Sequence, residues 1–174
     1  VQLKEEISAS CHHSKTLGQF CNQLLWNLFP QSGLVILNSF SGIYPRFTKE
    51  ILQREMENPL QSSLLINQAG ELLRQQGLKP QMHKAGDRCS FFLIENNERL
   101  AVYYKDSLFQ AGGRTFSRQE FLKRLEEHPA QFSAAANLRP VLQDAILPTA
   151  VSVLGPNEMA YQLQLKDIYA FHQV

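Results

Sequence analysis

The stretch RPVLQDAILPTAVSVLGPNEMAYQLQL, residues 139–165, decides the fold. Residues 138–147 place apolar side chains at helical spacing, and the pattern ends before a proline. Residues 149–154 (TAVSVL) are rich in β-branched side chains and predict a strand buried on both faces, as in a parallel sheet. A glycine and a proline follow, and a second helical pattern covers residues 159–171. This order predicts an α/β core with a parallel sheet.

The turn after this predicted strand is the candidate binding site. Ligands of parallel sheets bind beyond the carboxyl ends of the strands, and a helix N-terminus offers free N–H groups and a partial positive charge to an anion. Glu158 is expected to bind an amino group or to offset the helix dipole, since it lies in the first turn. A strand–Gly–Pro–helix junction is also common where nothing binds. The predicted substrate-binding residues of this stretch are Gly155, Pro156, Asn157, Glu158, Tyr161 and Gln164.

A second strand of the same kind is predicted near the N-terminus, over residues 33–38 (GLVILN). Asn38 and Ser39 follow it, and we expect them to face the same crevice and to complete the substrate site. An amphipathic helix is predicted before this strand, over residues 16–29, with Ser14 or Thr16 as the N-cap.

Residues 45–76 have a helical pattern that Pro59 interrupts and Gly77 ends, which predicts two helices or one kinked helix. Short aromatic-rich segments follow and predict a small antiparallel β-meander inserted into the core. Its tight turns are expected at Asn96-Asn97 and Gly112-Gly113. The segments are 79–84, 89–95, 99–105 and 107–111.

A further helix is predicted over residues 118–127, where Ser117 and Glu120 form a capping box. The predicted organisation is therefore a first part of the core (1–77), a connecting β insert (78–116) and a second part of the core (117–174).

Composition excludes several classes of function. The net charge is +1 and no basic stripe is present, which argues against a nucleic-acid partner. No apolar run approaches the ~20 residues that span a bilayer, so no membrane association is expected. Three cysteines at unrelated spacings favour a reducing, cytoplasmic setting. Cys11-His12-His13 lacks a second ligand pair, so a polar linker is favoured there over a metal site.

Considered as a whole, the chain resembles the middle portion of the bacillithiol-biosynthesis cysteine-adding enzymes, the cysteine ligase family. The resemblance covers nearly all 174 residues, and its shared order and spacing make chance similarity improbable. The motifs that carry it are GLVILN (33–38), REMEN (54–58), AGGRTFSRQEFLKRLEEHPAQFS (111–133) and, most strongly, LRPVLQDAILPTAVSVLGPNEMAYQLQLK (138–166).

The resemblance implies an incomplete Rossmann-like core and, in the full-length protein, a C-terminal coiled coil that forms a homodimer. The implied reaction is a carbon–nitrogen ligation in which L-cysteine is added to the amine of glucosaminyl-malate. The resemblance leaves the identity of the cofactor open, with a nucleotide as one candidate, and it assigns no catalytic residue.

Two departures from the family pattern lead to further expectations. Leu154 stands where the family usually has a glycine, and the family's Gly-rich N-terminal segment and coiled coil are absent. We therefore expect a fragment that is inactive alone. The alternatives are a non-catalytic ligand-binding or interaction module, and the nucleotide-binding domain of another transferase.

Overall fold

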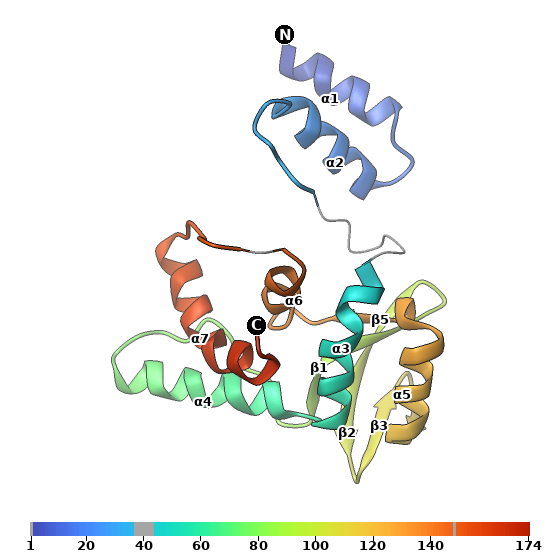
Figure 1. Cartoon of the computed structure of the whole chain (residues 1–174), viewed down its shortest axis with the longest axis vertical. Helices are drawn as coiled ribbons and strands as arrows, with labels where there is room; N and C mark the ends of the chain where they lie inside the picture. The colour runs from blue at the N-terminus through green and yellow to red at the C-terminus, as the bar shows by residue number, and fades with distance from the viewer. Residues whose placement is uncertain (1, 37–43, 148) are drawn as a thin grey trace. The chain divides into compact units, whose positions relative to one another are not determined.

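The computed structural model describes residues 2–36, 44–147 and 149–174. The chain forms two compact units, Val1–Ser39 and Phe40–Val174. Figure 1 labels the helices and strands of both units. The predicted divisions at residues 77 and 116 fall inside the second unit and stay predictions.

The first unit contains two helices, α1 (Gln2–His12) and α2 (Leu17–Leu28). Helix α2 confirms the predicted amphipathic helix, and Thr16 is its N-cap, accepting a hydrogen bond from the Gln19 amide at 3.2 Å. Helix α1 was not predicted. Cys11 and His12 belong to its last turn, so the prediction of a polar linker there is wrong.

The sheet of the second unit has five strands: β1 (Arg88–Glu95), β2 (Glu98–Lys105), β3 (Leu108–Ala111), β4 (Arg114–Phe116) and β5 (Phe132–Ala134). Their order is β4-β3-β2-β1-β5, and every neighbouring pair is antiparallel. Strands β1, β2 and β3 confirm the predicted meander. Residues 79–84 form no strand, so that segment of the prediction is wrong, and β4 and β5 were not predicted.

Tight turns join the meander strands where they were predicted. Asn96 and Asn97 have φ values of 49° and 63°, and Gly112 and Gly113 have φ values of 55° and 75°. Two successive residues with positive φ match the right-handed twist of the flanking strands, which is why asparagine and glycine occur there.

Helices α3 (Tyr44–Glu57) and α5 (Arg118–Glu127) cover one face of this sheet (Figure 1). Alternate residues of β1 point toward these helices, because side chains along a strand alternate between its faces. The core is aromatic: the rings of Phe109 and Phe121 stack at 4.7 Å, and Phe91 and Phe132 pack edge-on or tilted around them. Phe121 is supplied by α5, whose Ser117–Glu120 capping box is confirmed. A short 3-10 turn, Pro129–Gln131, leads from α5 to β5.

The other helices are α4 (Gln61–Gln75), α6 (Arg139–Ile146) and α7 (Pro156–His172). Helix α4 packs against α7, and the chain breaks between α3 and α4 at Pro59, as predicted. Gly77 ends α4 with a φ of 76°, and its amide donates to Arg74 O at 2.9 Å. The predicted helices on both sides of residues 148–155 are confirmed.

The fold is thus mixed α/β, but the predicted parallel sheet is not confirmed. Residues 149–154 form no strand, and Val151 and Val153 are 80% and 96% exposed, so the prediction of a buried strand there is wrong. Residues 33–36 form no strand either, and the rest of that predicted strand lies outside the described residues. β-branched composition gives strand propensity, but a strand also needs a hydrogen-bonding neighbour.

Candidate functional site

The first turn of α7 is exposed and holds four of the predicted site residues, Gly155, Pro156, Asn157 and Glu158. Pro156 takes the first helical position, where its missing N–H costs nothing. Glu158 Oε2 accepts the Gly155 amide at 2.8 Å, so its carboxylate folds back over the helix start. The amides of Asn157 and Glu158 have no acceptor among the described residues, and both are available to a ligand.

Gly155 has an ordinary φ of −73°, so its backbone conformation does not require glycine. A Cβ added there would meet only Glu158 Oε2, at 3.6 Å. Neither the backbone nor the surroundings of Gly155 therefore require a glycine, and Leu154 beside it is half-buried.

Tyr161 and Gln164 lie one and two turns further along α7 and have different surroundings. Tyr161 is half-buried, and its hydroxyl donates to Ala136 O at 2.7 Å. Gln164 is fully buried. Its Oε1 accepts the amides of Gln81 and Met82 at 3.0 and 3.1 Å.

The Gln164 Nε2 donates to the carbonyls of Ile66 and Met82 at 3.0 and 2.5 Å. All four hydrogen-bonding positions of this amide are thereby used. Gln164 supports the helix that carries the site, by joining α7 to α4 and to residues 81–82. Asn38 and Ser39, the remaining predicted residues, lie outside the described residues.

A pair of arginines lies near Tyr161 and was not predicted as part of the site. Arg99 of β2 donates through Nη2 to Ala134 O at 3.1 Å, at the end of β5 and two residues before the carbonyl in the following loop that accepts from the Tyr161 hydroxyl. Arg139, the first residue of α6, closes this loop. The sequence does not predict this pair, because only the fold brings β2, the loop and α7 together.

Glu55, Ser62 and His172 form a buried polar cluster that resembles a catalytic triad in composition alone. His172 Nε2 lies 2.9 Å from Glu55 Oε1 and 3.4 Å from Ser62 Oγ, and Ser62 also donates to Glu55. A triad needs the acid on one ring nitrogen and the serine on the other. Here both lie on Nε2, Nδ1 has no partner among the described residues, and all three side chains are buried. The cluster therefore joins α3, α4 and α7 structurally.

Lys84 is a half-buried ionisable group that sequence reasoning missed. Its Nζ donates to Cys89 O, Ser90 Oγ and Asn137 Oδ1 at 2.9, 3.1 and 3.2 Å. Burial lowers the pKa of Lys84 to about 8, although the charge of Glu55 opposes this shift. Burial also raises the pKa of the Cys89 thiol to about 12, which makes it an unreactive packed side chain.

Three hollows found among the described residues do not involve the predicted site. One, of about 540 Å³, lies between α3, α6 and α7 and includes Arg54 and Asp144. Two of its charged groups have partners: Arg54 donates to Phe171 O at 3.0 Å, and Asp144 accepts from Tyr169 at 2.6 Å.

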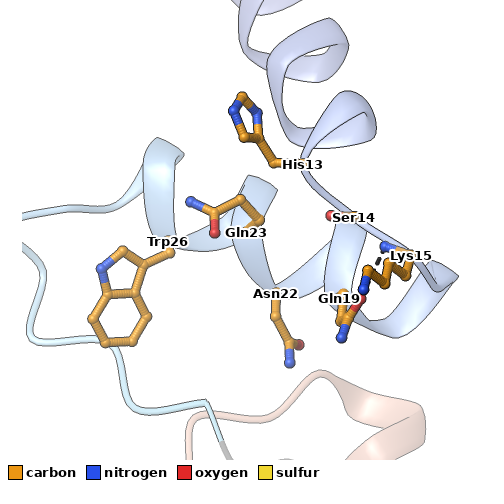
Figure 2. Close-up of a pocket in the computed structure, with 7 residues that line it drawn as sticks. All are labelled: His13, Ser14, Lys15, Gln19, Asn22, Gln23 and Trp26. Carbon is orange, nitrogen blue, oxygen red and sulfur yellow. Dashed lines mark hydrogen bonds between the residues drawn. The ribbon is translucent and has the colours of Figure 1, made fainter.

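The remaining two lie in the first unit: one of about 410 Å³ beside Cys11 and Thr16, and one of about 480 Å³ between the end of α1 and α2 (Figure 2). The second of these is the more polar. Amide side chains and the exposed Trp26 line it, and Gln19 accepts a bond from the Lys15 amide at 2.9 Å. Its lining has one lysine and no charged pair, so nothing there selects a ligand. Cys11 and His12 lie nearby, but no described group of three or more His, Cys, Asp or Glu side chains is arranged to hold a metal ion. Among the described helices, none has the length and apolar character that a membrane crossing requires.

Comparison with known proteins gives one consistent result. Residues 1–174 match the family described as "Bacillithiol biosynthesis BshC, N-terminal Rossmann-like domain". A protein of Thermus thermophilus named "Putative cysteine ligase BshC" is 33% identical over 157 residues, which are 90% of this chain and 32% of that protein. Proteins of the same name from Salinibacter ruber and Geobacillus kaustophilus are 33% and 30% identical, over 95% and 94% of this chain.

The chain spans about a third of the length of these relatives, 30% to 32%. The match nevertheless covers every residue of the chain, in both compact units. The chain therefore belongs to the BshC family of bacillithiol biosynthesis and falls within its N-terminal Rossmann-like domain.

Proposed function

We propose that this chain supplies one wall of the substrate pocket in a ligase that joins L-cysteine to glucosaminyl-malate through an amide bond. Membership of the family supports the proposal, and so does the cysteine-ligase name of the relatives. The observation that carries the site is the exposed first turn of α7, where two free amides lie beside the Glu158 carboxylate.

This turn suits a substrate that carries both signs of charge. The Glu158 carboxylate attracts an ammonium group, and the free N–H groups of Asn157 and of Glu158 itself attract carboxylate oxygens. Amide formation requires the amine of glucosaminyl-malate to lose its proton and attack an activated cysteine carboxyl carbon. In the proposal this wall orients the amine, and activation of the carboxyl is left to other parts of the full-length protein, with a nucleotide as one candidate source.

The proposal extends to the whole protein. The full-length enzyme acts as a homodimer, and the 174-residue chain alone is inactive, because one wall cannot both activate the acid and hold the amine. The check is direct: purified chain and full-length protein are each given L-cysteine, ATP and glucosaminyl-malate, and the amide product is measured by mass spectrometry. Formation of the amide product by the 174-residue chain alone would overturn the statement that this chain is inactive.

Glu158→Gln in the full-length protein tests the site itself. Glutamine can still accept the Gly155 amide, as capping boxes allow, so the helix start is kept while the charge is lost. We expect kcat/KM for glucosaminyl-malate to fall roughly 10-fold or more, since a charged hydrogen bond contributes about 1.5–3 kcal/mol. Glu71→Gln is the matched control, because Glu71 is an exposed helical carboxylate whose partner among the described residues is Arg74. Unchanged kinetics in Glu158→Gln would remove the site from the proposal.

Leu154 favours a second function, a non-catalytic binding module. It stands beside Gly155, where the resemblance leads one to expect a glycine, and a bulkier neighbour narrows approach to the helix start. A full-length protein that binds glucosaminyl-malate but forms no product would support this alternative. Restored turnover in Leu154→Gly would identify the residue responsible.

A further inference from the structure

Three donor groups from different elements meet at residues 134–139, which comprise the last residue of β5, the loop after it and the first residue of α6. Arg99 bonds to this segment at Ala134 O, and Tyr161 bonds to it at Ala136 O. Arg139 is held at the end of the segment, where its amide donates to Ala135 O at 3.2 Å. The segment thus gathers two guanidinium groups and a phenol hydroxyl one turn beyond Glu158 on α7.

All three groups are held by neighbouring residues of one short segment, so they lie close together, and their charges affect one another. Burial, with a further contribution from the charge of Arg139, lowers the pKa of Arg99. Burial raises the pKa of Tyr161, and the charge of Arg139 opposes that shift. Two cations held near each other repel, and an anion bound between them relieves the repulsion.

The two arginines differ in how far their donors are used. The Arg99 guanidinium lies 4.2 Å from the centre of the Phe92 ring and also donates to Ser133 Oγ at 3.2 Å. Arg139 is exposed, and its side chain has neither a carboxylate nor a hydrogen-bond partner among the described residues. The planar set of N–H donors of the Arg139 guanidinium is therefore available to a ligand, and the Arg99 guanidinium adds a fixed positive charge near it.

We propose that Arg139, with Arg99 behind it and Tyr161 beside it, binds a carboxylate group of the substrate. The proposal rests on the function proposed above, in which the amine substrate carries the two carboxylates of its malate part. A guanidinium group matches a carboxylate with two parallel hydrogen bonds. The Glu158 carboxylate, one turn before Tyr161 on α7, attracts the ammonium group of the substrate. The two ends of the substrate are thus sorted by charge, amine toward Glu158 and carboxylate toward Arg139.

The test uses the full-length protein with Arg139→Gln and Arg139→Lys. L-malate and inorganic phosphate are titrated separately by calorimetry, and KM is measured for glucosaminyl-malate and for L-cysteine. We expect Arg139→Gln to weaken L-malate binding and to raise KM for glucosaminyl-malate roughly 10- to 100-fold, with KM for L-cysteine unchanged. Arg139→Lys, which keeps the charge but loses the fork, should lie between. Arg74→Gln is the matched control, an exposed helical arginine distant in sequence from this loop.

Each outcome decides one point. If Arg139→Gln leaves both the affinity for L-malate and the KM for glucosaminyl-malate unchanged, the carboxylate site is overturned. The proposed function still holds in that case, provided that the wild-type protein turns over its substrates. If the full-length protein has no ligase activity but binds L-malate through Arg139, the proposed function is overturned and the carboxylate site is supported. Arg139-dependent binding of phosphate without binding of L-malate would overturn the carboxylate assignment. Equal rises in both KM values would show a general structural role for Arg139 and would also overturn the proposal.

Discussion

Gln164→Met removes the amide that joins α7 to α4 and to residues 81–82 while keeping the length of the side chain. Four backbone groups lose their partner: the amides of Gln81 and Met82 and the carbonyls of Ile66 and Met82. At about 0.5–1.5 kcal/mol for each hydrogen bond, the loss is roughly 2–6 kcal/mol. Because residues 81–82 are partly exposed and their freed groups can bind water, we expect the lower half, about 2–4 kcal/mol.

The assay is hydrogen exchange of the amides that the Gln164 oxygen accepts. Those of Gln81 and Met82 should exchange roughly 30-fold faster or more in Gln164→Met, since 1.4 kcal/mol corresponds to a factor of ten. Gln143→Met, at an exposed position of α6, is the control and should leave this exchange unchanged. Equal protection of Gln81 and Met82 in wild-type and Gln164→Met protein would refute the reasoning, because it would show that the amide contributes nothing to holding this segment.

Three other changes can be measured by urea unfolding. Gly70→Ala should lower the midpoint, although alanine favours a helix by about 1 kcal/mol, because its Cβ would lie 2.9 Å from the fixed Gln164 Nε2; a higher midpoint would contradict this. Ser117→Ala should cost about 1 kcal/mol through loss of the N-cap, and a value near zero would contradict it. Between pH 8 and 9 the free energy of unfolding should rise, and Lys84→Met should abolish the rise. The pKa of Lys84 is about 8 in the folded chain and 10.5 in the unfolded chain, so between these pH values the unfolded chain binds more protons and stability rises with pH. Above about pH 9 the raised pKa of Cys89 acts in the opposite direction and opposes this gain.

Local signals in the sequence predict the structure correctly wherever interactions between neighbouring residues decide it. The Ser117–Glu120 capping box, the Asn96-Asn97 turn and the break at Pro59 each depend on residues within four positions of one another. The same holds for the helix start at Pro156, so the exposed turn of the candidate site could be placed from the sequence. Helix caps and tight turns satisfy their own backbone groups locally, and no distant partner can change them.

Features that depend on distant partners could not be predicted in the same way. Gln164 follows Glu158 at helical spacing, which suggested a shared pocket, but α4 and residues 81–82 close over it and use its whole amide. Arg99 has no motif around it and gains its place only because its side chain reaches across β1 to Ser133 and Ala134 of β5. Helix periodicity predicts which residues share a face, and it does not say which part of that face another element covers.

Residues 149–154 show that a segment can have a high β-strand propensity and still lack the neighbouring strand that a sheet requires. Val151 and Val153 point to a strand because β-branched side chains suit a pleated surface, yet both are exposed and the segment has no neighbouring strand among the described residues. Strands β1 to β3, by contrast, bring their own neighbours through two-residue turns, so their pairing follows from adjacent sequence. An antiparallel meander is therefore predictable from one continuous segment, whereas a parallel strand depends on a partner reached only through a long crossover. For the candidate site, this means that the chemistry of the α7 turn can be inferred from residues 155–158 alone, but the wall facing it cannot.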